Sequence, residues 1–194
     1  MIPKNTAKVI LFLLRNTDKL GFNINQMAKL NKISVGSAFK ILKGLEKDRL
    51  IIKNEISNAS HYKLDLDNPE TTKLCELLLL AEKRSLKGYA KVYADELVKC
   101  EDAGVIMIFG SVLRGKEFND VDVLFVTNQT KKVNDFCLEI SKVRTKPIVP
   151  LIMRLEDLVK ALKQRKEVII SLIQEGIVLR GESLFVEAIK NVNP

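Results

Sequence analysis

Two aspartates near the middle of the chain could hold a metal ion. Asp120 and Asp122 are separated by one apolar residue, Val121, at the start of an apolar run that is typical of a strand. Successive side chains of a strand point to opposite faces, so both carboxylates are expected on one face. Such a pair can bind one Mg²⁺ ion or bridge two. We therefore predict Asp120 and Asp122 as metal ligands and catalytic positions of a phosphate-transfer site.

A glycine and a serine precede the two acids at the end of another apolar run. Residues 105–109 predict a buried strand, and Gly110 and Ser111 follow it directly. Gly110 allows a tight turn, and Ser111 is predicted to begin a helix whose free N–H groups and positive dipole end favour phosphate. Arg114 adds a nearby positive charge. Gly110, Ser111 and Arg114 are therefore predicted to bind a nucleotide beside the metal.

This segment, residues 104–126, resembles the small nucleotidyltransferases of the polymerase-beta superfamily. Gly110-Ser111, Arg114-Gly115 and the Asp120/Asp122 pair follow an apolar strand in the order of that family. The resemblance implies a nucleotidyltransferase-like α/β domain with a small mixed sheet that binds Mg²⁺ and a nucleoside triphosphate. The family pattern also has a third carboxylate on a later strand, whereas residues 148–153 contain no acid. Enzymatic activity is therefore left open, and a glycine turn followed by two surface acids is the alternative interpretation.

The excess positive charge of the chain lies in its first third. Residues 1–66 contain 12 Lys and Arg against 5 Asp and Glu, whereas residues 67–194 contain 20 against 19. A basic excess confined to one part of a chain indicates an anionic partner, most often nucleic acid. We therefore expect the first third to bind DNA.

The same region has the pattern of three short helices followed by a hairpin. Helices are predicted at residues 6–14, 26–30 and 35–47, strands at 49–53 and 61–64, and a turn at 57–60. This order resembles the winged helix-turn-helix domain of transcription regulators, over residues 5–66.

Ser34 is predicted to cap the third helix, with Phe39, Leu42 and Leu45 facing inward. The resemblance implies that the outward face of this helix enters the major groove. The residues predicted to contact DNA are Ser34, Ser37, Lys40 and Lys43 on the helix and Asn58 and Ser60 on the wing. An ordinary solvated helix face, or a protein-docking role, is the alternative.

The remaining elements complete an α+β protein of two principal domains. We expect a winged helix-turn-helix domain at residues 1–66, a helical connector at 67–87 and the nucleotidyltransferase-like domain at 88–194. The further predicted elements are helices at 71–85, 88–100, 133–143, 155–163 and 168–175, a strand at 148–153, a break at 176–181 and then a short strand and a last helix.

Composition narrows the class of protein. No apolar stretch reaches the ~18 residues of a membrane span, and the N-terminus lacks the pattern of a signal peptide. Cys75, Cys100 and Cys137 have no metal-ligand spacing and are expected to be reduced and partly buried, and His61 has no neighbouring ligand for zinc. A cytoplasmic protein without a membrane partner is expected.

Three functions fit these observations. The first is a homodimeric, DNA-binding transcriptional regulator whose transferase-like domain binds Mg-nucleotide. The second is an active nucleotidyltransferase that transfers a nucleoside monophosphate to a protein, a small molecule or a nucleic acid. The third is the antitoxin of a toxin-antitoxin pair, with a small helical toxin as partner.

Overall fold

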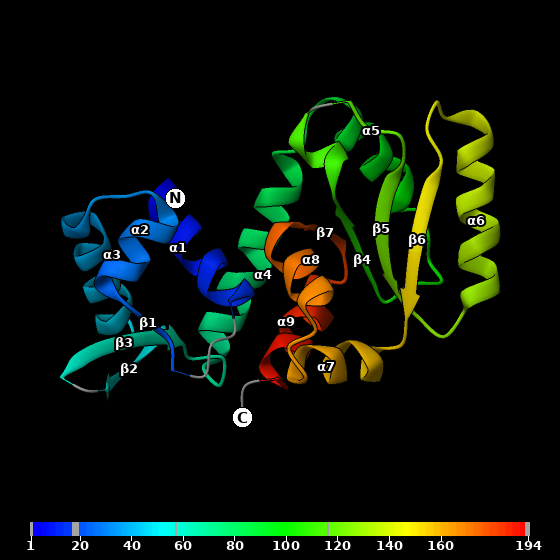
Figure 1. Cartoon of the computed structure of the whole chain (residues 1–194). Helices are drawn as coiled ribbons and strands as arrows, with labels where there is room; N and C mark the ends of the chain where they lie inside the picture. The colour runs from blue at the N-terminus through cyan, green and yellow to red at the C-terminus, as the bar shows by residue number, and fades with distance from the viewer. Residues whose placement is uncertain (1, 17–19, 57, 116, 193–194) are drawn as a thin grey trace. The chain divides into compact units, whose positions relative to one another are not determined.

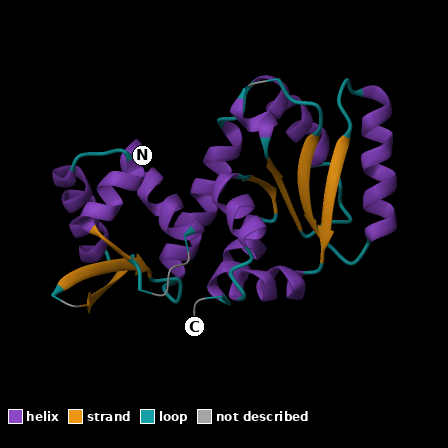
Figure 2. Cartoon of the chain, in the orientation of Figure 1, coloured by secondary structure: helices purple, strands orange, loops and turns teal. Residues whose placement is uncertain are grey.

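The contacts within the chain divide it into two compact units. The structure is a computed structural model that describes residues 2–16, 20–56, 58–115 and 117–192. One unit consists of Met1–Leu78 with Ile189–Pro194, and the other of Leu79–Ala188. Each unit contains helices and one small sheet, so the predicted α+β class is confirmed (Figure 2). The predicted functional boundaries at residues 66 and 87 stay predictions.

In the first unit, three helices precede a β-hairpin, as Figure 1 shows in blue and cyan. The elements are α1 (Lys4–Arg15), β1 (Phe22–Asn23), α2 (Ile24–Asn31), α3 (Val35–Lys47), β2 (Ile51–Ile56) and β3 (Ala59–Leu64). The sheet is antiparallel in the order β1-β3-β2. The short strand β1 was not predicted, because two residues carry no periodicity. At the far end of the chain, Lys190 forms an ion pair with Asp67 (2.9 Å) within this unit.

Side-chain caps fix where α2 and α3 begin. The Asn23 side chain accepts a hydrogen bond from the Gln26 N–H, and the Gln26 side chain accepts one from the Asn23 N–H, both at 2.9 Å. The Ser34 hydroxyl oxygen accepts from the Ser37 N–H (3.1 Å), which confirms Ser34 as the cap of α3. These bonds satisfy N–H groups that have no partner within the helix.

The inward face of α3 differs from the prediction at Phe39. Leu42 and Leu45 are buried as expected, but the third inward residue is Ala38, and Phe39 is 48% exposed. Ala38 is fully buried, and its small side chain suits the close packing of α3 against α2. The prediction that Phe39 faces the core is therefore wrong.

The second unit is built on a four-stranded sheet. Its elements are the end of α4 (Pro69–Arg84), α5 (Gly88–Leu97), β4 (Val105–Phe109), the 3₁₀ turn η1 (Ser111–Arg114), β5 (Val121–Val126), α6 (Thr130–Val143), β6 (Ile148–Met153), α7 (Leu155–Lys163), α8 (Glu167–Glu175), β7 (Ile177–Arg180) and α9 (Glu182–Lys190). The strand order is β6-β5-β4-β7, with β5 and β6 parallel and the other pairs antiparallel. The sheet is therefore mixed, as predicted.

One face of this sheet packs against α5 and α6 (Figure 1). Alternate residues of β5, Val121, Val123 and Phe125, are fully buried in this core. Asp122 lies between them in the strand, so its side chain points to the opposite face. The core thereby determines which side of the sheet carries the acid.

Tyr93 of α5 joins this core to the loop before β6. Its ring is 1% exposed, and its hydroxyl donates to the Lys146 carbonyl (2.8 Å) and accepts from the Lys146 N–H (3.0 Å). A buried hydroxyl with two backbone partners fixes the loop that leads into β6.

All three cysteines are also buried and free, as expected, and burial raises the pKa of the Cys75 and Cys137 thiols to about 12.

Among the helices of the described ranges, none has both the length and the apolar composition that a membrane span requires.

Replacement of Tyr93 by Phe tests this loop anchor. Tyr93→Phe keeps the ring but leaves two backbone groups without their partner, so we expect a loss of about 1–3 kcal/mol in the free energy of unfolding. Urea denaturation measures it. Tyr89→Phe, at a ring that is 61% exposed, is the matched control and is expected to change little. Equal stabilities of the two variants would contradict the anchoring role.

Candidate functional site

The pairing of β4 with β5 brings Gly110 against Asp122. Phe109, the last residue of β4, is the register partner of Asp122, and Gly110 follows it with φ = 81°. Residues with a side chain rarely adopt this backbone angle. A Cβ at position 110 would also collide with Oδ2 of Asp122. The turn therefore favours glycine here, and any side chain at this position would also force the Asp122 carboxylate to move.

The chain after Gly110 forms a shorter element than predicted. Ser111–Arg114 make one 3₁₀ turn, which ends at Gly115 with φ = 64°. Four residues are too few for a helix with a substantial dipole, because aligned peptide units must add up along the axis. The predicted phosphate-binding helix at Ser111 is therefore not formed, and Gly115 in the left-handed region explains why the turn stops there.

Asp120 and Asp122 influence each other at the start of β5. Asp120 immediately precedes the strand and Asp122 is its second residue; both are half-buried. Partial burial, and then the charge of Asp120, raise the pKa of the Asp122 carboxyl above its usual value. Two nearby carboxylates repel each other when both are ionised, and a bound cation would remove that repulsion. This pair is therefore suited to a divalent cation.

Asp122 lines a hollow of about 500 Å³ between the sheet and α8. α8 contributes Glu167, Ser171 and Glu175, which recur every four residues and so lie on one side of the helix. Sequence analysis did not identify these two glutamates. Their spacing was a signal for a shared face, but nothing in the sequence placed that face next to Asp122. The complete lining is Phe109, Gly110, Arg114, Asp122, Glu167, Val168, Ser171, Leu172 and Glu175.

Negative charge exceeds positive charge around this hollow. Asp122, Glu167 and Glu175 line it together with one cation, Arg114. Arg114 Nη1 lies 3.4 Å from Glu175 Oε2, and both side chains are 59% exposed. Such an exposed ion pair is weak and can exchange partners. Phosphate groups would therefore enter this hollow only together with divalent cations.

The position next to Asp122 on the neighbouring strand is apolar. β6 runs parallel to β5 and pairs Val149 with Asp122. No acid lies on β6, and within the described part of the chain no three His, Cys, Asp or Glu side chains gather closely enough to hold a metal ion. Two carboxylates fit a Mg²⁺ ion that takes its other ligands from phosphate oxygens and water. The donors present thus fit a metal-nucleotide complex better than a metal held by protein alone.

A second hollow, of about 680 Å³, is lined by two lysine side chains and by Val112 of η1. It is lined by Lys87, Tyr89, Phe118 and Lys146, among others, and Tyr89 and Phe118 meet edge to face at 5.5 Å between ring centres. Asp122, Asp120, Ser111 and Arg114 do not line it. Lys87 and Lys146 do not line the hollow that contains Asp122.

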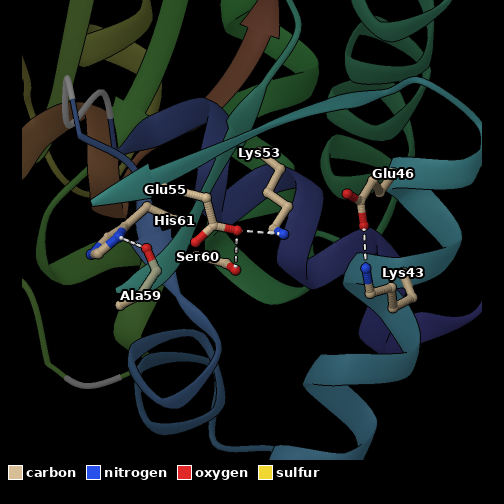
Figure 3. Close-up of polar contacts among 7 residues, drawn as sticks. All are labelled: Lys43, Glu46, Lys53, Glu55, Ala59, Ser60 and His61. Atoms are coloured by element: carbon tan, nitrogen blue, oxygen red, sulfur yellow. Dashed lines mark hydrogen bonds and ion pairs between the residues drawn. The ribbon is translucent and has the colours of Figure 1, made fainter. Parts of the chain in front are cut away.

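On α3, the predicted DNA-contacting residues have different local partners. Lys40 and Lys43 are exposed, and Ser37 is half-buried. Lys43 Nζ lies 2.7 Å from Glu46 Oε2, one turn along the helix (Figure 3). Since exposed ion pairs of this kind are weak, Lys43 can turn to a phosphate. Ser34 is already engaged as the helix cap.

The hairpin carries a carboxylate among the predicted wing contacts. Ser60 Oγ donates to Glu55 Oε1 (3.0 Å), and Lys53 pairs with the same carboxylate, as Figure 3 shows. These two bonds, that of Lys53 first, lower the pKa of the Glu55 carboxyl. Asn58 is exposed at the tip with φ = 63°, which asparagine tolerates. Ser57, part of the predicted turn, lies outside the described residues. Lys53 of the hairpin is thus paired with a nearby carboxylate, as Lys43 of α3 is.

A comparison of the chain with protein-family models, with curated proteins and with solved structures found no match.

Neutralising Asp122 should stabilise the folded protein at neutral pH. Its pKa is raised in the folded state, so the folded protein retains a proton there that the unfolded chain releases, and stability falls as the pH rises through that interval. Asp122→Asn is expected to raise the melting temperature at pH 7 in metal-free buffer. At acidic pH, where the carboxyl is protonated in both the folded and the unfolded state, the difference should disappear.

Thermal denaturation as a function of pH measures this effect. Asp135→Asn, at an exposed position of α6, is the control for loss of one negative charge. A wild-type protein more stable than Asp122→Asn at neutral pH would contradict the electrostatic conflict.

Proposed function

We propose that this protein is a DNA-binding regulator whose first unit binds DNA through α3 and whose second unit binds a magnesium-nucleotide complex. We assign the first unit as a winged helix-turn-helix domain and the second as a nucleotidyltransferase-like domain. Two copies acting on two half-sites would match the common binding mode of such regulators. The observation that carries the proposal is the exposed, lysine-bearing face of α3 in a helical unit with most of the excess positive charge.

The arrangement of α2 and α3 supports DNA binding. α3 is held by the cap at Ser34 and by burial of Leu42 and Leu45, so its outer side is free to carry Lys40 and Lys43. A rigid helix with exposed lysines can place several cations against a duplex at once, and each phosphate contact releases bound counterions.

The approach of Gly110 to Asp122 supports nucleotide binding by the second unit. Gly110 leaves room for a half-buried carboxylate whose pKa is raised by partial burial and by the charge of Asp120. This arrangement suits a cation bound between Asp122 and phosphate oxygens. In this proposal Asp120 and Asp122 hold Mg²⁺, while Gly110, Ser111 and Arg114 lie beside the nucleotide.

An active nucleotidyltransferase is the second candidate. The same Gly110–Asp122 geometry favours it, because paired carboxylates can serve a metal-assisted transfer of a nucleoside monophosphate. Val149 at the register position of β6 weighs against it, since no carboxylate is there to accept the proton of an attacking hydroxyl. The antitoxin role would be compatible with either activity and adds a small helical toxin as partner.

Removal of two lysines from α3 tests DNA binding. The double variant Lys40→Ala, Lys43→Ala should bind duplex DNA more weakly, and the slope of log affinity against log salt should become shallower by about 0.9 for each phosphate that the protein no longer neutralises. Fluorescence anisotropy of a labelled duplex over a range of salt concentrations measures both. Lys131→Ala with Lys160→Ala removes the same charge from exposed positions of the second unit. Equal affinities and slopes for the two double variants would contradict the proposal that α3 contacts the DNA.

Removal of the two acids tests nucleotide binding. Asp120→Asn with Asp122→Asn should abolish Mg²⁺-dependent binding of ATP, GTP, CTP or UTP, because the bridging cation loses its protein ligands. Isothermal titration calorimetry with and without Mg²⁺ measures binding, and pyrophosphate release in the same samples distinguishes a transferase from a nucleotide-binding regulator. The control, Glu156→Gln with Asp157→Asn in the exposed first turn of α7, should bind like the wild type. Metal-dependent binding retained by the Asp120/Asp122 variant would overturn the site.

A further inference from the structure

The outer side of α3 carries apolar as well as cationic side chains. Val35 is 52% exposed and Phe39 48%, and together with Lys43 they recur at four-residue intervals along one side of the helix. Large apolar side chains that stay exposed to water do not gain the free energy that burial would give them. A partner that covers this stripe would gain that free energy.

Two glycines lie on the adjoining line of the same helix. Gly36, Lys40 and Gly44 also recur every four residues, and nothing lies within 4 Å of a Cβ built on either glycine. Glycine is less favourable than alanine within a helix, and here no packing within the chain requires its small size. Their absent side chains would instead let another molecule approach the helix backbone closely.

Charge identifies the kind of molecule that fits this surface. Lys40, Lys43 and Lys47 are exposed on α3, and the only acid of the helix, Glu46, is half-buried beside Lys43. This surface suits an anionic partner that also presents apolar groups at the depth of Val35 and Phe39. The DNA major groove has both features, because thymine places its methyl group there between the two phosphate backbones.

We propose that Val35 and Phe39 contact thymine methyl groups in the major groove, and that Gly36 and Gly44 let α3 lie deeply in that groove. This inference rests on the proposed DNA-binding function and adds its sequence preference. Lysines position the helix on the phosphates, which carry no sequence information, whereas the apolar stripe distinguishes A·T-rich from G·C-rich sites. In this proposal, apolar side chains on a cationic helix recognise the base sequence.

Substitution of uracil for thymine isolates the methyl contact. A labelled duplex of alternating dA and dT is compared with the same duplex containing dU, which lacks only the methyl group and keeps the hydrogen-bonding edge. Each buried methyl is expected to strengthen binding by about fourfold, so the full-length wild-type protein should bind the thymine duplex more tightly. Phe39→Ala should bind the thymine duplex more weakly and lose most of this preference.

The control variant is Leu20→Ala, an exposed apolar position of the same unit outside α3. It should keep the wild-type preference for thymine. Equal wild-type affinities for the two duplexes, with binding still dependent on Lys40 and Lys43, would overturn the inference and leave the proposed function intact. No binding to either duplex would overturn both. Conversion of a wild-type oligomer to monomers by Phe39→Ala would assign the stripe to a second copy of the chain and also overturn the inference.

Gly44→Ala tests the close approach independently of base contacts. Alanine is the better helix former and meets no neighbour at this position, so the variant should unfold at a higher temperature than the wild type. The same added methyl should reduce DNA affinity severalfold if the helix backbone lies close to the groove. Unchanged affinity in the more stable variant would reject the close approach.

Discussion

The antiparallel pairing of β4 with β5 determines the candidate site of the second unit. It sets Phe109 opposite Asp122, and the next residue must then turn past a carboxylate. Glycine adopts this positive φ readily, and it has no Cβ that would push the carboxylate aside. The buried residues on the other side of β5, Val121 and Val123, hold that register, because a slip by one residue would bury the acid and expose the core.

This arrangement places carboxylates that repel one another beside an otherwise apolar sheet. Partial burial and Asp120 both raise the pKa of Asp122, and Glu167 and Glu175 of α8 add further negative charge around the same hollow. Sites that lower stability in this way are common where a ligand is bound, since the ligand offsets the cost. In the proposed function, a divalent cation with a polyphosphate would satisfy the carboxylates and Arg114 together, whereas a free nucleotide would meet mainly repulsion.

In the first unit, α3 is buried along one side and exposed around the rest of its surface. Ala38, Leu42 and Leu45 bind α3 to the rest of the unit, and the cap at Ser34 fixes its beginning. Around the rest of the helix, lysines, two glycines and the exposed pair Val35 and Phe39 are available for a partner. A surface that combines positive charge with apolar groups suits a ligand that is both anionic and apolar in its groove.

Local pattern was sufficient to predict most elements of the chain. The apolar runs at 105–109 and 148–153, the cap at Ser34 and the alternation around Asp122 are read from neighbours in sequence, and the structure has these elements at or near the predicted bounds. The prediction failed at Phe39, because helical spacing gives two adjacent faces and only the packing of α2 selects Ala38 over its neighbour. It failed also at Ser111, where Gly115 ends the turn before a helix can extend.

The sequence by itself therefore determined most of the helices and strands, the side of β5 that carries Asp122 and the position of the basic excess, since these follow from periodicity and composition. Tertiary structure alone decided that Gly110 touches Asp122, that Val149 lies where an acid was sought, and that Glu167 and Glu175 approach from α8. These residues are far apart in sequence. Their proximity results from strand pairing and from the packing of α8 on the sheet, which no local pattern records.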